Sequence, residues 1–413
     1  MRRILQNAGF NAVGSIFDRG SIVALTAMLS GALSPIAFSA FGQFQLTLTM
    51  LAAFASVGLA VSTSRIFAEH DAGRSDDLPM IGTMWLLSLF AALCLGLTIT
   101  LISLVGPMIH TGLPPAFLLL GLTVLTLGVV ANGGVLGFGL FREAAIVSIV
   151  TAAVVLGIGA LAAVQRSLFL AAIAVIAGYG VNSLLASWLI FRRVSFGQLF
   201  SRQTLTRDAV MGVGRLVGPL AFVTLLAASG NWLLGQMLHL GVDATRAFSS
   251  FVIGLQWYAL VQFLPSLLSR AIFPSIVRNS LAESGRAAGR KELWQAAALS
   301  VLSAALVAVG IAVLSPVLAR LYAPDAVQGG VILTVFAVAA LPQSVANMFG
   351  NVLVAARLQS RWASLTLQWF AVLLISALAL VRYGAIGMAG ALFIGGCYLA
   401  LMAVVAARRE GLV

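Results

Sequence analysis

Among the ionisable residues within or at the ends of long apolar stretches of this sequence, six are its candidates for chemistry. They are Asp18, Arg19, Arg65, Arg215, Arg246 and Arg270. An ionisable side chain in a membrane-spanning helix costs at least about 2.5 to 3.5 kcal/mol at the bilayer centre, so it needs a partner or a hydrated cavity. Five arginines and one aspartate favour an anionic ligand, and the planar guanidinium group suits phosphate because it binds two oxygens at once.

Depth in the bilayer separates three of these residues from the rest. At 1.5 Å per residue, Asp18 and Arg19 stand roughly 12 to 14 Å into their apolar stretch, and Arg215 stands roughly 9 Å into another. We expect these three side chains to face one another near the middle of the membrane. The simpler interpretations are that Asp18 and Arg19 neutralise each other and that Arg215 extends to the inner surface. Surface anchoring is the simpler interpretation of the other three, Arg65, Arg246 and Arg270.

The composition excludes a soluble protein. The 413 residues are 61% hydrophobic and 9% charged, with a mean hydropathy of +1.06, whereas soluble domains are about one-quarter charged. The net charge of +12 does not indicate a nucleic-acid partner, because the cations, all arginine except Lys291, do not cluster with aromatic residues. The two cysteines, Cys94 and Cys397, lie far apart in apolar stretches and indicate no metal or disulfide site.

Membrane-spanning helices must hold these six residues in place. A helix crosses the hydrocarbon core in about 20 residues, and charged residues, prolines and glycines divide the sequence into twelve apolar runs of about that length. The predicted spans are 10–32, 41–64, 80–107, 116–140, 144–164, 168–191, 209–233, 245–269, 294–319, 331–356, 362–381 and 385–407. The sequence therefore predicts an all-α polytopic membrane protein.

The distribution of Lys and Arg predicts the orientation of these spans. With the N-terminus in the cytoplasm, 18 of the 24 cations fall in cytoplasmic segments, 4 fall in outer segments and 2 lie within spans. Cytoplasmic loops of membrane proteins carry the excess of positive charge. Both termini are therefore predicted to be cytoplasmic.

An internal repeat divides the chain into two halves. Ser64-Arg65 recurs as Ser269-Arg270 at an offset of 205, Val130-Ala131-Asn132 recurs as Val345-Ala346-Asn347 at 215, and Arg192-Arg193 recurs as Arg408-Arg409 at 216. We interpret residues 1–200 and 201–413 as two six-helix lobes. Since six is even, both lobes enter the membrane in the same orientation and are related by a pseudo-two-fold axis, an arrangement typical of transporters. No Walker-type phosphate loop, His/Cys metal cluster or Gly-x-Ser-x-Gly motif occurs, so the sequence does not predict an enzyme.

Several segments along nearly the whole chain resemble polysaccharide flippases. They are Leu33-Ser34-Pro35, Phe41-Gly42-Gln43-Phe44, Asn231-Trp232, Phe263-Leu264-Pro265 and the run from Tyr383 to Ala391. These flippases are the O-antigen and exopolysaccharide translocases of the multidrug/oligosaccharidyl-lipid/polysaccharide (MOP) exporter superfamily. The resemblance implies a two-lobed carrier like those of the multidrug and toxic compound extrusion (MATE) family. It also implies no enzymatic activity and no bound cofactor.

The same resemblance implies a substrate and a set of roles. The substrate is undecaprenyl-pyrophosphate-linked oligosaccharide, which moves by alternating access from the cytoplasmic to the periplasmic leaflet of a bacterial inner membrane. Arg19 is the position that would bind the pyrophosphate, and Asp18 is the candidate for coupling to sodium or protons, with the membrane potential as a further driving force. A polysaccharide polymerase and a chain-length regulator are the implied protein partners.

Three other functions stay open. A multidrug exporter of the same superfamily needs intramembrane carboxylates for cationic drugs, and only Asp18 is present in the predicted spans. A major-facilitator carrier shares the six-plus-six organisation. A membrane glycosyltransferase or polymerase needs catalytic residues on a large outer loop, whereas the predicted outer connections are short.

Overall fold

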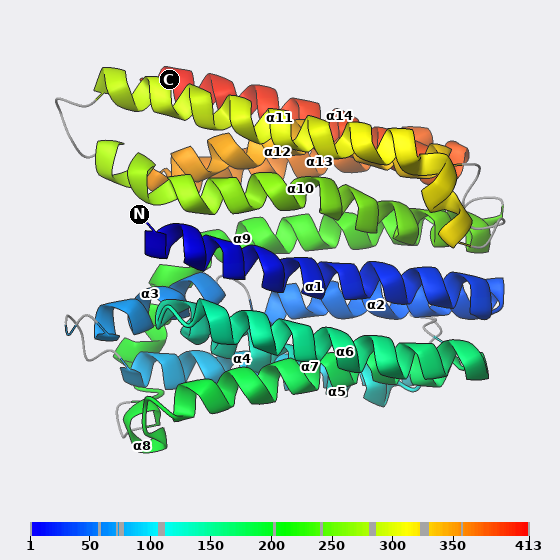
Figure 1. Cartoon of the computed structure of the whole chain (residues 1–413), viewed down its shortest axis with the longest axis horizontal. Helices are drawn as coiled ribbons and strands as arrows, with labels where there is room; N and C mark the ends of the chain where they lie inside the picture. Colours follow the sequence, from blue (N-terminus) through cyan, green and yellow to red (C-terminus); the bar gives the residue numbers. More distant parts are fainter. Residues whose placement is uncertain are drawn as a thin grey trace. The chain divides into compact units, whose positions relative to one another are not determined.

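The computed structural model describes ten segments of the chain, and every regular element in them is a helix (Figure 1). The described residues are 2–56, 59–71, 73, 78–105, 112–200, 204–239, 243–280, 286–322, 330–356 and 358–411.

The described part of the first half is a succession of helices. They are α1 (Arg2–Ala32), α2 (Pro35–Ser56), α3 (Leu59–Asp71), α4 (Leu78–Val105), α5 (Pro115–Gly137), α6 (Phe141–Gln165), α7 (Leu168–Phe191) and α8 (Phe196–Leu199). Helix α9 (Arg207–Leu238) follows. The remaining helices are α10 (Ala244–Ser280), α11 (Arg286–Leu318), η2 (Ala319–Leu321), α12 (Val331–Ala355), α13 (Gln359–Leu380), η3 (Val381–Tyr383) and α14 (Gly384–Arg409).

Twelve of the described helices are long enough to cross a bilayer, with lengths from 22 residues in α2 and α13 to 37 residues in α10. Eleven stretches of the described residues are also apolar enough, and the last of them, Gln359–Arg409, contains both α13 and α14. The prediction of an all-α, multi-pass membrane protein with about twelve spans is therefore confirmed.

The helix ends differ from the predicted span ends at several places, and two of these differences are informative. The predicted span 41–64 covers parts of both α2 and α3, and residues 57 and 58 between them lie outside the described part. Helix α10 continues to Ser280, well past the predicted end at residue 269. Hydropathy marks where the lipid ends, whereas a helix whose backbone is already hydrogen-bonded continues into water until a breaking residue stops it.

The chain divides into two compact units, which we call unit 1 (Met1–Ala228) and unit 2 (Ser229–Val413). The division falls within α9. At Gly212 this helix lies against Met80 of α4 in unit 1, and at Gly230 it lies against Trp369 and Leu373 of α13 in unit 2. The lobes 1–200 and 201–413, inferred from the sequence repeat, remain a prediction.

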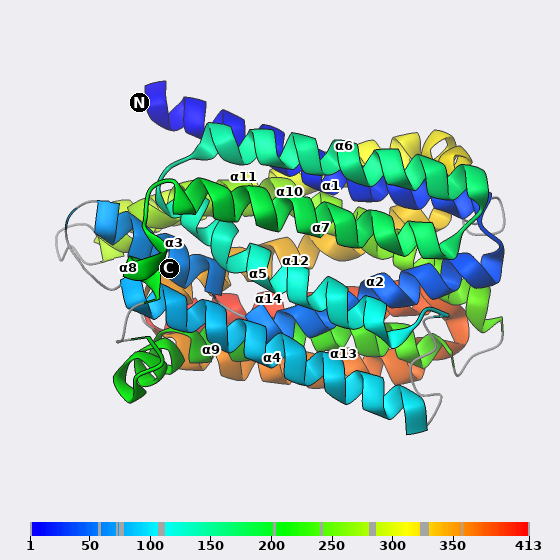
Figure 2. The ribbon, with the colours of Figure 1, turned by 90° about the horizontal axis from the view of Figure 1, so that it is seen from below.

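The order of helix neighbours is the same in both units. In unit 1, α6 packs against α1 and α7, and α5 packs against α7, α4 and α3 (Figure 2). In unit 2, α13 packs against α9 and α14, and α12 packs against α14, α11 and α10. Each helix of unit 2 thus has the neighbours of its sequence counterpart in unit 1. The repeat seen in the sequence is a repeat of packing.

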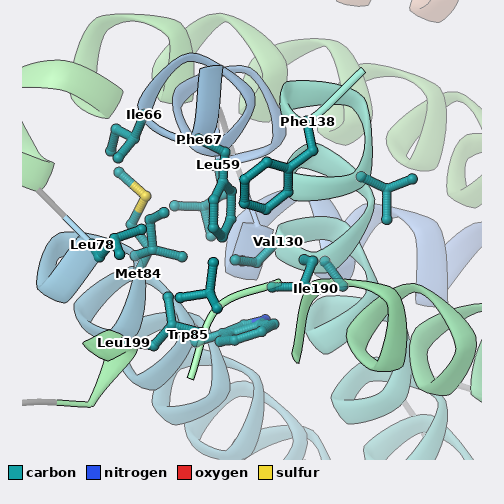
Figure 3. Packing of buried hydrophobic residues seen from close by; sticks show 14 of the residues in the cluster. Leu59, Ile66, Phe67, Leu78, Met84, Trp85, Val130, Phe138, Ile190 and Leu199 are labelled. Carbon is teal, nitrogen blue, oxygen red and sulfur yellow. The ribbon is translucent and has the colours of Figure 1, made fainter. Parts of the chain in front are cut away.

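A buried hydrophobic cluster at one end of unit 1 holds α3, α4, α5 and α7 together (Figure 3). The rings of Phe67 and Phe138 lie with centroids 4.7 Å apart. Trp85 is 5% exposed and donates its indole N–H to the backbone carbonyl of Leu127 at 3.1 Å. Because Phe67 is fully buried, the opposite side of α3, which carries Arg65, is turned outward.

Candidate functional site

Asp18 on α1 is hydrogen-bonded to α6 inside the membrane-spanning part of unit 1. The Ser148 hydroxyl donates to Asp18 Oδ2 at 2.9 Å. One turn earlier, Gly14 brings the two helices together, because a Cβ atom there would stand 3.1 Å from the Cα of Ala145 and 3.3 Å from Ser148 Oγ. Small residues at helix interfaces allow this close approach in membranes. Gly14 therefore positions the carboxylate against its hydroxyl partner.

Two further side chains complete what we call the Asp18 site: Asp18, Arg19, Ser148 and Tyr179. The positive charge of Arg19 acts on the Asp18 carboxylate, and the carboxylate acts in turn on the phenol of Tyr179 on α7. Helices α1 and α6 thus bring together a carboxylate, a guanidinium and a hydroxyl, and the phenol of Tyr179 on α7 lies within electrostatic range of the carboxylate. The sequence identified Asp18 and Arg19, but not Ser148 and Tyr179.

The Asp18 site is accessible. Asp18 and Arg19 are both exposed, as are their apolar neighbours Ile16 (57%) and Phe17 (44%). The reason is that α1 packs chiefly against one helix, α6, among the described residues. Adjacent residues on a helix point about 100° apart. Asp18 is therefore directed toward α6, and the exposed Arg19 leaves α1 in a different direction.

Arg65 lies at the surface of α3 in an ion pair. Its Nε donates to Glu69 Oε1 at 2.7 Å, and the two side chains are 66% and 35% exposed. A pair of this kind, four residues apart on one helix, contributes roughly 0.3 to 0.5 kcal/mol. This geometry is the one expected of a surface anchor, and it does not bring Arg65 to the Asp18 site.

Three of the predicted arginines are placed only in part. Arg246 is an exposed residue in the first turn of α10. Arg215 and Arg270 lie in α9 and α10, and their side chains lie outside the described residues. The expectation that Arg19 and Arg215 face each other therefore stays a prediction.

Unit 2 carries a group of uncharged polar side chains. From the sequence, one of them, Gln262, is a candidate to line a hydrated path for sugar hydroxyls, and helix-to-helix hydrogen bonds explain it equally well. We call the group the amide cluster: Gln262 on α10, Gln343 and Asn347 on α12, Ser364 and Gln368 on α13, and Tyr398 on α14. Gln343 Nε2 donates to Asn347 Oδ1 at 3.0 Å, and Asn347 Nδ2 donates to Gln262 Oε1 at 3.3 Å.

The second half of the amide cluster joins α13 and α14. The Tyr398 hydroxyl donates to Gln368 Oε1 at 2.7 Å, and Gln368 Nε2 lies 3.5 Å from Ser364 Oγ. None of the predicted spans of the second half contains an acidic residue, so this cluster is a neutral counterpart to the charged Asp18 site. Among the described residues, no three His, Cys, Asp or Glu side chains gather in a way that would hold a metal ion.

No protein-family model matches the chain, and no curated protein matches it either. Several solved structures are similar to the chain. An inward-facing multidrug resistance MATE family transporter of the MOP superfamily aligns with a TM-score of 0.79 and 17% identity over 98% of each chain. An outward-facing MATE transporter aligns with a TM-score of 0.69 and 18% identity over 99% of this chain and 95% of the other.

A third similar structure is a MOP superfamily transporter from Pyrococcus furiosus, described by the words "reverse polarity of binding pocket suggests different function". It aligns with a TM-score of 0.67 and 17% identity, covering 99% of this chain and 95% of the other. At these identities the likeness concerns the fold. The predicted MATE-like architecture is confirmed: this chain has the fold of the MATE transporters of the MOP superfamily.

Proposed function

We propose that this protein translocates undecaprenyl-pyrophosphate-linked oligosaccharide from the cytoplasmic to the periplasmic leaflet of a bacterial inner membrane by alternating access. In this function it supplies surface polysaccharide or O-antigen assembly, together with a polymerase and a chain-length regulator. The observation that carries the proposal is an exposed arginine, Arg19, more than halfway along a membrane-spanning helix of a MATE-like transporter fold.

Arg19 favours an anionic substrate. Its guanidinium group offers five N–H donors in a planar fork that matches two phosphate oxygens. Asp18 is the single acidic residue of the twelve predicted spans, and its carboxylate is already directed to Ser148. In the solved transporter from Pyrococcus furiosus, reverse polarity of the binding pocket suggests a different function. Pocket polarity therefore differs among structures of this fold.

The remaining candidates take supporting roles in the proposal. Arg215 is the second pyrophosphate ligand, and Arg65, Arg246 and Arg270 attract the headgroup at the two membrane surfaces. A substrate that carries about two negative charges is stabilised by roughly 4.6 kcal/mol per 100 mV when it moves outward across a membrane whose inside is negative. The potential alone can therefore drive flipping.

Asp18 is the ion-coupling residue in this proposal. Its carboxylate and the Ser148 hydroxyl are oxygen groups, which are the ligands that hard cations and protons take in proteins. Sodium or a proton bound at Asp18 neutralises the carboxylate and increases the net positive charge around Arg19. Ion binding and anion binding then support each other.

The test uses purified protein in liposomes with labelled lipid-linked oligosaccharide and no nucleotide sugar, so that translocation is measured without synthesis. We expect Arg19→Gln to slow outward translocation at least about tenfold, the loss of one charge-assisted contact. Arg320→Gln, at an exposed arginine in η2, is the matched control and leaves the rate unchanged. Translocation by Arg19→Gln at the wild-type rate would falsify the assigned role.

A multidrug exporter is the second candidate, and the observation that favours it is the alignment with multidrug resistance MATE transporters. Cationic drugs need a carboxylate, so in this case Asp18 rather than Arg19 carries the function. The two candidates separate in one assay. Efflux of ethidium that is abolished by Asp18→Asn and unaffected by Arg19→Gln supports the exporter and contradicts the flippase.

A further inference from the structure

We propose that the amide cluster of unit 2 recognises the hydroxyl groups of the uncharged, carbohydrate part of the substrate. This inference rests on the proposed function, since it assigns to unit 2 the part of the lipid-linked glycan that a basic site does not bind. It makes Gln262, Gln343 and Gln368 residues that determine specificity.

Within the amide cluster, one buried donor and one buried acceptor have no hydrogen-bond partner. In the chain from Gln343 through Asn347 to Gln262, each inner atom has a partner. At the two ends, Gln343 Oε1 and Gln262 Nε2 are buried and find no hydrogen-bond partner among the described residues. The Tyr258 hydroxyl also forms a side-chain hydrogen bond with Gln262. A network that only joined helices would satisfy these atoms.

A third buried donor lies on α13. Trp369 is 5% exposed, and its Nε1 finds no hydrogen-bond partner among the described residues. It lies against α14 at Gly395, where a Cβ atom would stand 3.1 Å from Nε1. The next residue, Gly396, brings α14 to α12, because a Cβ atom there would stand 3.3 Å from the backbone nitrogen of Gln343. Gln343 of α12 and Trp369 of α13 therefore both contact the same short segment of α14, at Gly395 and Gly396.

The repeat places the two halves of the cluster at one level. Asn347 and Tyr398 are the counterparts of Asn132 and Asn182, at offsets of 215 and 216. In unit 1 those two asparagines are hydrogen-bonded, with Asn132 Nδ2 donating to Asn182 Oδ1 at 2.6 Å. Since the helix neighbours are the same in both units, Asn347 and Tyr398 stand at matching levels of α12 and α14.

Part of the amide cluster is open to its surroundings. Asn347, Ser364 and Gln368 are exposed although they lie within membrane-spanning helices. An amide that faces hydrocarbon loses its hydrogen bonds to water, so this surface is expected to face a hydrated space rather than lipid. Exposed amides beside buried, unsatisfied ones make a surface on which a ligand can form hydrogen bonds.

The chemistry of the amide cluster selects an uncharged, polyhydroxylated ligand. A carboxamide presents a donor and an acceptor side by side, which suits neighbouring hydroxyl groups that each donate and accept. No member of the cluster carries a charge, so it offers neither a counter-ion for a cationic drug nor a cation for phosphate. A site built to hydrogen-bond hydroxyl groups discriminates strongly against a ligand that lacks them.

The test compares two probes on the full-length protein in nanodiscs: undecaprenyl pyrophosphate, and undecaprenyl pyrophosphate that carries one N-acetylglucosamine. We expect the wild type to bind the sugar-bearing lipid at least about tenfold more tightly, the effect of one or two hydrogen bonds to uncharged groups. The near-isosteric variants Gln343→Met and Gln368→Met reduce this ratio to about threefold or less. Their affinity for the bare lipid stays at the wild-type value.

Gln45→Met, in a membrane-spanning helix of unit 1, is the matched control and keeps the wild-type ratio. Thermal unfolding of every variant checks that it is folded, and Gln368→Met, at an exposed position, serves if Gln343→Met unfolds. An unchanged ratio in the folded variants overturns the inference, and so does an equal loss of affinity for both lipids.

The same measurement separates this inference from the proposed function. Binding of the bare lipid that depends on Arg19, with a wild-type ratio near one, overturns the role of the amide cluster and leaves the flippase standing. Binding of the sugar-bearing lipid alone, reduced by Gln343→Met, overturns the pyrophosphate role of Arg19 and supports the cluster. Failure of the wild type to bind either lipid overturns both.

Discussion

Units 1 and 2 have the same order of helix neighbours but place different polar groups at equivalent positions. Ser148 of unit 1 and Ser364 of unit 2 are counterparts at an offset of 216; the first donates to a carboxylate and the second contacts an amide. At the positions of Gln343 and Gln368, unit 1 has Gly128 and Ala152. Packing has been kept while the chemistry has diverged.

The helix contacts that the two units share are the structural part of the repeat. Gly14 and Gly230 both lie where the first helix of a repeat meets the fifth, so close approach is a shared requirement. The charged pair Asp18 and Arg19 has no charged counterpart in unit 2, where residues 229–238 of α9 carry no charge. We therefore interpret unit 1 as the unit that binds ions and the headgroup, and unit 2 as the unit that binds neutral groups.

The largest expected effect comes from separating α1 from α6. A leucine at Gly14 cannot fit 3.1 Å from the Cα of Ala145, so Gly14→Leu moves α1 and breaks the contact between Asp18 and Ser148. We expect translocation to fall about a hundredfold, the effect of misplacing a functional group by about 1 Å. Gly310→Leu, in unit 2 with no atom within 4 Å of its Cβ position, keeps its activity. Equal losses in the two variants would refute a special role for the α1–α6 contact.

The second effect concerns ion coupling in unit 1. Asp18→Asn keeps the size and the hydrogen-bonding capacity of the side chain and removes its charge. We expect stimulation by a sodium or pH gradient to fall at least about fivefold, the lower end of ordinary coupling between two ligands, while flipping driven by the membrane potential persists. Flux in liposomes with each gradient imposed separately measures this. Retained stimulation contradicts the role of Asp18.

A third effect compares the two counterpart serines. Ser148→Ala removes a hydrogen bond to a carboxylate from a buried serine, and we expect it to lower the free energy of unfolding by about 1.5 kcal/mol. Ser364→Ala removes an exposed contact of 3.5 Å and is expected to cost less than about 0.5 kcal/mol. Thermal and denaturant unfolding in detergent measure both. A larger loss for Ser364→Ala would show that the two units are not divided as we describe.

The smallest effects are those of two surface ion pairs, one in each unit. Arg65 pairs with Glu69 within α3, and Arg361 pairs with Glu410 between α13 and the end of α14. The second pair is less exposed and joins two elements, so we expect Arg361→Ala to cost about 1 kcal/mol and Arg65→Ala about 0.3 kcal/mol. Raising the salt concentration narrows this difference. A larger cost for Arg65→Ala would point to a role for Arg65 beyond anchoring.

The sequence predicted the helices and the repeat because lipid imposes a strict requirement on length and hydropathy. It also identified Asp18 and Arg19, since ionisable residues are conspicuous in an apolar helix. It did not identify Ser148 or Tyr179, because a serine or tyrosine in an apolar helix is ordinary. Only the packing of α1, α6 and α7 brings them to Asp18.

The amide cluster was only partly visible in the sequence. Polar residues such as Gln262 and Asn347 are as typical of helix-to-helix hydrogen bonds as of a hydrated path. The sequence does not show which of their atoms are satisfied. The buried atoms Gln262 Nε2 and Gln343 Oε1, without partners among the described residues, are what distinguish the two interpretations.

A binding measurement can show whether Arg19 recognises a pyrophosphate group within the membrane. The affinities of wild type and Arg19→Gln are compared for undecaprenyl pyrophosphate and for uncharged undecaprenol in nanodiscs. We predict that the wild type prefers the pyrophosphate at least about tenfold, as expected for one charge-assisted contact, and that Arg19→Gln loses this preference. An equal preference in the wild type and in Arg19→Gln would contradict the account.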